Sequence, residues 1–138
     1  MYTPPNFRAA AAAYRTVGAE SAVASATPHQ LINMLFEGLM QALNAARGAM
    51  SRGDLAAKGV QIQRSVRLLE EGLKAGLDEV RGGELASRLR ALYDYCIARL
   101  THANARNDGA ALAEVVNLIS PLAASWKQIG SSAAAQQA

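Results

Sequence analysis

The chain has 138 residues, of which 51% are hydrophobic and 18% charged, so its composition is that of an ordinary globular domain. A chain of this length buries enough surface to fold as one domain without disulfides or a structural metal. The single cysteine, Cys96, allows no internal disulfide and suits a reducing compartment. The formal net charge of +3 only weakly favours an acidic partner, and no secretory signal or uninterrupted apolar run of about 18 residues is visible. We therefore expect a cytoplasmic protein with no membrane insertion.

Residues 1–26 differ in composition from the rest of the chain. They contain two prolines near their start and a run of alanines, with Phe7, Tyr14 and Val17 as isolated large apolar groups. We predict that this segment forms a mobile N-terminal arm, which is either free or lies along the folded part.

The clearest helix start is the tetrapeptide Thr27-Pro28-His29-Gln30. It combines an N-cap threonine, a proline at the first helical position and a glutamine at N3, which together form a capping box. The pattern predicts a long helix that runs to about Ser51, where Arg52-Gly53 supplies a left-handed stop. Asp54 is then the N-cap of the next helix.

The first helix carries apolar residues around most of its circumference. Its polar members are Asn33, Glu37, Gln41 and Asn44. They recur at steps of four, four and three and therefore form one narrow stripe, whereas a bundle helix normally buries an apolar stripe little wider than about 100°. Two interpretations remain open: the helix is the central element of the fold, or part of its surface is a groove for an amphipathic helix of another chain.

Three further segments carry apolar residues at steps of three and four, as amphipathic helices do. The second segment has Leu55, Gly59, Ile62, Val66, Leu69, Leu73, Leu77 and Val80. The third has Leu85, Leu89, Leu92, Cys96, Leu100 and Ala103. The fourth has Leu112, Val116, Ile119, Leu122, Trp126 and Ile129. We expect Gly82-Gly83 to end the second helix and Asn107-Asp108-Gly109 to end the third, with Asp108 as the N-cap of the fourth.

Pro121 lies inside the fourth apolar stripe. It removes one backbone donor and presses on the carbonyl of Asn117, so we predict a kink or break around Ser120. We expect residues 131–138 to be a disordered tail. Four helices of this length joined by short connectors must alternate in direction, which predicts an all-α, antiparallel up-down-up-down four-helix bundle over residues 27–130.

The sequence offers no catalytic constellation. Its two histidines are His29 and His102, and His102 lies six residues after Cys96, about 240° around a helix, so the two cannot share a metal from one face. The acidic pairs Glu70-Glu71 and Asp78-Glu79 are adjacent in sequence and point in different directions. We therefore expect no enzyme activity, no cofactor and no metal site.

Two binding functions compete on composition alone. The sequence pI near 9.4 favours nucleic acid, but the cations are scattered among acids and no basic run with interleaved aromatics appears, so we expect no nucleic-acid partner. A structural or adaptor bundle that oligomerises through its first helix and binds a regulatory protein is the more serious alternative. Whether the protein is a monomer or a homodimer stays open.

Several motifs carry a family resemblance that runs from about Tyr14 to Lys127. Ala13-Tyr14-Arg15-Thr16-Val17 is followed by a continuous similar stretch over residues 20–38. Later motifs include Leu92-Tyr93-Asp94-Tyr95, Arg99-Leu100, Ala103-Asn104, Asn107-Asp108 and Trp126-Lys127. At these positions the sequence resembles the family of the flagellar export chaperone FliS.

The resemblance implies a cytoplasmic chaperone with a helical-bundle fold and no catalysis. Its client would be the disordered C-terminal region of flagellin, which is kept from polymerising before delivery to the flagellar type III export apparatus. Further implied partners are the flagellar export gate and, in some bacteria, an anti-sigma factor. The N-terminal tyrosine motif of relatives folds over the hydrophobic client site and maps here to Tyr14 and Ala11, which with Val17 form the predicted cap.

We expect the client-binding side chains to lie on the first and third helices. They are Ile32, Phe36, Met40, Tyr93, Tyr95, Arg99 and Asn104. Methionines suit a surface that repacks around a client, although core filling is the ordinary role of Met34 and Met40. Tyr93 and Tyr95 fall on different helical faces, so one can join the core while the other points outward.

Overall fold

The computed structural model describes residues 25–137, and the side chains of residues 25–130 within that range. These residues form four α-helices and one short π-helix, with no strand among them. The elements are α3 (Pro28–Ser51), α4 (Leu55–Arg67), η1 (Leu68–Lys74), α5 (Glu79–Arg106) and α6 (Gly109–Gln137). The all-α class is therefore confirmed.

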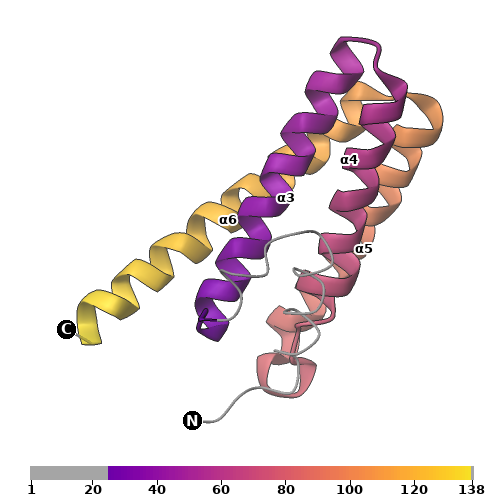
Figure 1. The fold of residues 1–138 in the computed structure, drawn as a ribbon. Coiled ribbons are helices and arrows are strands. Elements are labelled where there is room, and N and C mark those ends of the chain that lie inside the picture. Colours follow the sequence, from indigo (N-terminus) through magenta and orange to yellow (C-terminus); the bar gives the residue numbers. More distant parts are fainter. Residues whose placement is uncertain (1–24, 138) are drawn as a thin grey trace.

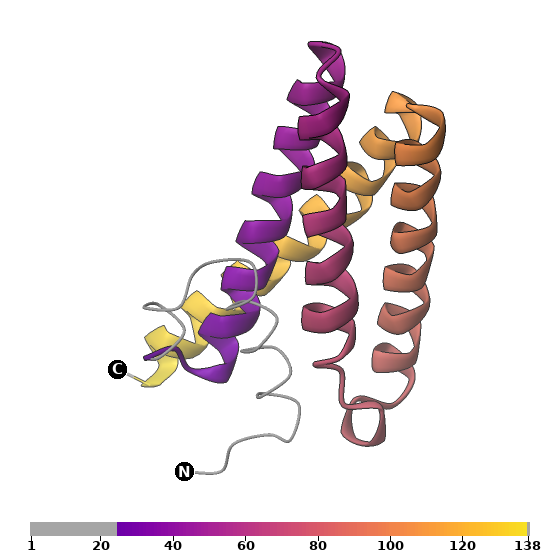
Figure 2. The same ribbon diagram turned by 45° about the vertical axis from the view of Figure 1, so that its right-hand side comes forward.

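Consecutive helices run in alternating directions (Figure 1). The α3–α4 and α5–α6 connections lie at one end of the molecule, and the connection from η1 to α5 lies at the other. Helix α3 packs against α4, η1 and α6, and α5 packs against α4, η1 and α6. Helix α6 crosses the direction of α3 obliquely, and its last turns diverge from α4 and α5 (Figure 2).

The predicted start and end of the first helix are confirmed. The Thr27 amide donates to Oε1 of Gln30 at 2.9 Å, and the Gln30 amide donates to the Thr27 hydroxyl at 3.1 Å, which completes the capping box. The helix ends at Ser51, and Gly53 follows in the left-handed region with φ 74°. The Asp54 carboxylate accepts the Ala57 amide at 3.1 Å and caps α4 as expected.

The predicted boundary between the second and third helices is wrong. The π-helix η1 ends at Lys74, and Asp78 caps α5 by accepting the Arg81 amide, so the Gly82-Gly83 pair lies inside the first turns of α5. Gly83 has φ 54°, a conformation that only glycine adopts without strain, and the kink at this residue separates the short helical segment that follows Asp78 from the rest of α5. As a result Val80 and Leu85, which we placed on apolar stripes, are 94% and 67% exposed.

The third boundary is confirmed. Of the kink or break expected around Ser120, the break does not occur, because the helix is continuous there, and the kink stays a prediction. Asn107 is left-handed with φ 51°, and the Asp108 carboxylate accepts the amides of Ala110 and Ala111. Helix α6 then continues through Pro121 as far as Gln137, past the residue where we placed its end. Pro121 has no N–H to donate to the backbone carbonyl of Asn117. Asn117 is exposed, so water can donate to this carbonyl instead and the helix need not break.

Helix α3 is the central element of the described fold. Its buried residues are Leu31, Leu35, Phe36, Gly38, Leu39, Ala42, Leu43, Ala46 and Ala49. Of its polar stripe, Glu37, Gln41 and Asn44 are exposed. Neighbouring helices therefore cover most of its unusual apolar surface, while Ile32, Met34 and Met40 are only half-buried.

Helix α6 is the most apolar stretch of the described chain. Its segment Gly109–Gly130 has a mean hydropathy of 1.2, and by length and composition it alone among the described helices is sufficient for a membrane span. Leu112, Val115 and Ile119 of this segment are fully buried against the other helices. Only 28% of the apolar window of this segment is buried inside the structure, so core packing accounts for part of its apolar character.

Candidate binding groove

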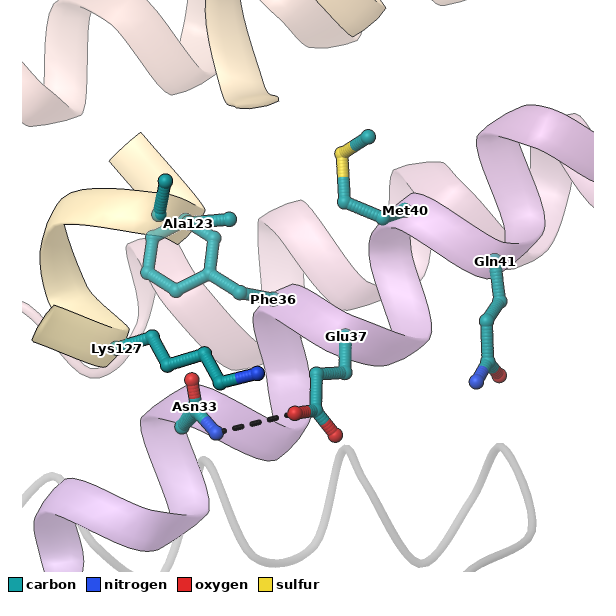
Figure 3. A pocket seen from close by; sticks show the side chains of 8 residues that line it. Asn33, Phe36, Glu37, Met40, Gln41, Ala123 and Lys127 are labelled. Atoms are coloured by element: carbon teal, nitrogen blue, oxygen red, sulfur yellow. Dashed lines mark hydrogen bonds between the residues drawn. The ribbon is translucent and has the colours of Figure 1, made fainter. Parts of the chain in front are cut away.

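A pocket of about 290 Å³ lies between α3 and α6. Its lining residues are Asn33, Phe36, Glu37, Met40, Gln41, Ala123, Ala124 and Lys127. The Phe36 ring reaches towards Ala123 of α6, and Met40 projects on the same side one turn further along α3 (Figure 3). The pocket exists because α6 presents two small alanines where α3 presents large side chains. We call this pocket, with its eight lining residues, the α3–α6 groove.

The rim of the α3–α6 groove is polar while its floor is apolar. Asn33 donates from Nδ2 to the Glu37 carboxylate at 3.2 Å, and the aliphatic stem of Lys127 extends from α6 towards this pair. An apolar floor with one acidic and one basic side chain at its rim suits the apolar face of an amphipathic segment. It offers no nucleophile and base in contact.

No other part of the described chain assembles a reactive centre. Among residues 25–130 no group of three histidine, cysteine or acidic side chains is placed to hold a metal ion. Burial raises the pKa of the Cys96 thiol to about 11, so it is held as the unreactive thiol. His102 lies at the surface with Nε2 3.1 Å from the Asp108 carboxylate, away from the cysteine's buried face.

The structure places only part of the predicted client-binding set in the groove. Phe36 is 4% exposed and Met40 is half-buried, and both line the groove. Ile32, one turn before Phe36, is half-buried beside Gly76 at the end of η1 and does not line the groove.

Tyr93, Tyr95 and Arg99 lie on α5, away from the groove. Tyr93 is 3% exposed, and burial raises its pKa to about 12, whereas Tyr95 is 44% exposed. The expectation that the two tyrosines occupy different environments is confirmed. The Tyr95 hydroxyl donates to one oxygen of Glu114 at 2.6 Å, and Arg99 donates from Nε to the other oxygen at 2.7 Å. Both side chains therefore join α5 to α6 in this conformation, and their contact with a client stays a prediction.

The remaining predicted site residues lie elsewhere or outside the described part. Asn104 is exposed near the end of α5, and its backbone carbonyl accepts the Lys58 ammonium at 3.1 Å. The predicted cap residues Ala11, Tyr14 and Val17 lie outside the described residues.

Sequence reasoning missed the α6 side of the groove. Ala123, Ala124 and Lys127 come from a helix whose pattern indicated only a buried stripe, and nothing local marks the two alanines as a groove wall. Their role depends on how α6 crosses α3, which is a tertiary property. The signal that was available is the surplus apolar surface of α3, to which Phe36 and Met40 of the candidate groove belong, and their contact with a client stays a prediction.

The described part of the chain thus presents an apolar groove between two helices. Comparison with known proteins identifies the class of protein. Residues 10–133 match the family described as flagellar protein FliS. The flagellar secretion chaperone FliS of Salmonella typhimurium (strain LT2) is 48% identical over 137 residues, which cover 99% of this chain and 98% of that protein. The chain belongs to the FliS family, which is a family of chaperones and not of enzymes.

More distant relatives carry the same name. The flagellar secretion chaperone FliS of Escherichia coli (strain K12) is 42% identical over 116 residues, 84% of this chain and 85% of that protein. That of Bacillus subtilis (strain 168) is 32% identical over 109 residues, 79% of this chain and 80% of that protein. The similarity therefore spans most of the chain in distantly related bacteria.

Proposed function

We propose that this protein is a cytoplasmic export chaperone for flagellin. In this proposal the disordered C-terminal segment of flagellin folds as a helix against the α3–α6 groove, is kept from polymerising, and is delivered to the flagellar type III export apparatus. Membership of the FliS family supports the class of function. The observation that carries the location is the groove itself, an apolar hollow on a helix whose other large apolar side chains are buried or half-buried against its neighbours.

A disordered client sets a physical requirement that the groove meets. A segment that orders on binding loses conformational entropy, which it must recover by burying apolar surface. Phe36 supplies a rigid aromatic floor, and Met40 supplies an unbranched side chain that adapts to different client side chains. A hollow of about 290 Å³ admits a few side chains, so the groove anchors one face of a helix and leaves the rest of the client on the outer surface.

The finer architecture of the protein belongs to the same proposal. We infer that the four helices form an antiparallel up-down-up-down bundle, with α6 set obliquely to leave room for the client. The N-terminal segment with Ala11, Tyr14 and Val17 caps the groove until the client arrives. The flagellar export gate and an anti-sigma factor are further proposed partners, and they contact surfaces other than the groove.

The groove is tested by Met40→Glu, with Val60→Glu as the matched control. The variant places a carboxylate on the apolar floor, and burying it against a client helix costs enough to weaken the binding of a flagellin C-terminal peptide by about tenfold or more. Val60 is 63% exposed on α4, so the same substitution there should leave the affinity within about twofold of the unchanged protein. Calorimetric titration measures both, and circular dichroism checks that each variant is folded.

The other possible results decide between the proposals. If Met40→Glu and Val60→Glu bind the peptide with equal affinity, the client binds elsewhere and the proposed location in the groove is wrong. If the unchanged protein leaves the peptide free and elutes as an oligomer that Met40→Glu dissociates, the structural or adaptor bundle is the correct function.

A further inference from the structure

His29 and Trp126 join the first turn of α3 to the late part of α6. Their rings are stacked with centroids 4.4 Å apart and planes inclined by 10°. The Trp126 indole also donates from Nε1 to the backbone carbonyl of His29 at 3.1 Å. One contact thus combines ring stacking with a hydrogen bond between residues that are far apart in the sequence.

Gly130 also lies close to the imidazole of His29. A Cβ atom built on Gly130 would overlap Nε2 of His29, so the ring occupies the space that any side chain at this position would need. The His29 Nε2 atom is buried and has no hydrogen-bond partner. The imidazole therefore stacks on the Trp126 indole and lies close to the backbone of Gly130, one helical turn further along α6.

These three residues lie at one end of the α3–α6 groove. His29 precedes the groove residue Asn33 by one turn on α3, and Trp126 is adjacent to the groove residue Lys127 on α6. At the other end, Ile119 of α6 is fully buried in the core. Two of the three α6 residues that line the groove thus lie between two positions where α6 is held against the fold, Ile119 and Trp126. Pro121, where one helical hydrogen bond is missing, lies between these two positions.

We propose that His29, Trp126 and Gly130 form a clasp that holds α6 at a fixed distance from α3 and so sets the width of the groove. All three are positioning residues, and their effect on the client rests on the proposed function above. When the clasp is open, the end of α6 moves relative to α3, and the groove has its binding-competent width for only a fraction of the time. The apparent affinity for a client falls by that fraction.

The test uses Gly130→Ala and His29→Ala, singly and together, with Gly59→Ala as the control. Both glycines lie in helices, so alanine gains about 1 kcal/mol of helix propensity at either position. At Gly59 the added Cβ lies 3.8 Å from the nearest side-chain atom and fits, whereas at Gly130 it must displace the imidazole. Trp126 is the only tryptophan of the chain, so its fluorescence reports directly on the clasp.

We expect Gly130→Ala and His29→Ala each to shift the Trp126 emission to longer wavelength. If the open clasp leaves about one tenth of the molecules competent to bind, each variant should also weaken the binding of a flagellin C-terminal peptide by about tenfold. The Gly59→Ala control should match the unchanged protein in both measurements. The double variant should be no worse than His29→Ala alone, because the methyl group added by Gly130→Ala has no imidazole left to clash with.

Two results would overturn the clasp. One is an unchanged emission spectrum in Gly130→Ala; the other is full peptide affinity in a variant whose emission has shifted. If the unchanged protein binds no peptide at all, the proposed function fails instead. The clasp is then judged by emission and by hydrogen exchange of α6 amides, which should be faster in both clasp variants than in Gly59→Ala.

Discussion

Glu114 of α6 receives two hydrogen bonds from α5. The Tyr95 hydroxyl and the Arg99 guanidinium each bind a different oxygen of its carboxylate. These two bonds, first that from Tyr95 and then that from Arg99, hold the pKa of Glu114 below its ordinary value of 4.5. Two residues expected to recognise a client thus also join two helices, which is a role that their sequence spacing alone did not indicate.

The lowered pKa of Glu114 predicts an acid-dependent contribution to stability. A carboxyl group whose pKa is lower in the folded than in the unfolded state stabilises the fold above its unfolded pKa, and this contribution is lost as the pH falls through its folded pKa. Glu114→Gln should therefore lower the urea midpoint near neutral pH. The difference from the unchanged protein should begin to shrink as the pH falls below 4.5, and it should disappear only below the lower folded pKa, where Glu114 of the folded protein becomes neutral.

Glu84→Gln is the matched control for this measurement. Glu84 pairs with Arg88 of the same exposed helix face, and such pairs contribute little to stability. A midpoint difference for Glu114→Gln that stays constant down to strongly acidic pH would contradict the ionised contact between α5 and α6.

At the scale of elements, a buried lysine connects α4 to the end of α5. Lys58 is 5% exposed, and its ammonium donates to the Asn104 carbonyl at 3.1 Å and to the Asn107 side chain at 3.2 Å. These acceptors lie in the last turn of α5 and at its left-handed C-cap, where carbonyls lack helical partners. A cation there satisfies them and interacts favourably with the helix dipole.

Lys58→Met should destabilise the fold by about 1 to 2 kcal/mol, because the carbonyl and amide acceptors of α5 lose a charged donor that methionine does not replace. Arg67→Met on the same helix is the control, since Arg67 forms only an exposed pair with Glu71. Denaturant unfolding monitored by circular dichroism measures both. An equal stability of the two variants would show that the buried ammonium adds nothing to the end of α5.

Element boundaries could be predicted from the sequence where a capping side chain and a stop agree. Thr27, Asp54 and Asp108 all cap helices as expected. The boundary between the second and third helices was predicted wrongly because two signals compete there. The Gly82-Gly83 pair indicates the end of a helix, whereas Asp78, which precedes it, is the N-cap at the start of one. The capping hydrogen bond of Asp78 formed, and Gly83 adopted its positive φ inside the helix.

The π-helix η1 could not be predicted from a periodicity of 3.6 residues. Leu68 and Leu69 are adjacent and both fully buried, although neighbouring residues of an α-helix point in different directions. The segment η1 packs against both α3 and α5. The apolar stripe predicted from the sequence contained Leu69 and left out the adjacent Leu68.

For the whole molecule, the sequence indicated two of the eight residues that line the candidate groove. The surplus apolar surface of α3 is a local property, so Phe36 and Met40 were predictable from composition and spacing. The clasp and the α6 wall of the groove depend on contacts between residues such as His29 and Trp126, which only the folded chain brings together. Local patterns carry no information about which positions on α6 face α3.

Hydrogen exchange with and without a flagellin C-terminal peptide tests the central claim most directly. Binding in the α3–α6 groove should slow exchange in the first half of α3 and in α6 after Pro121, which flank the groove. Exchange in the middle of α4 should remain unchanged. A bound peptide that protects only α4 and α5, or a peptide that leaves every amide of the chaperone unchanged, would contradict the account.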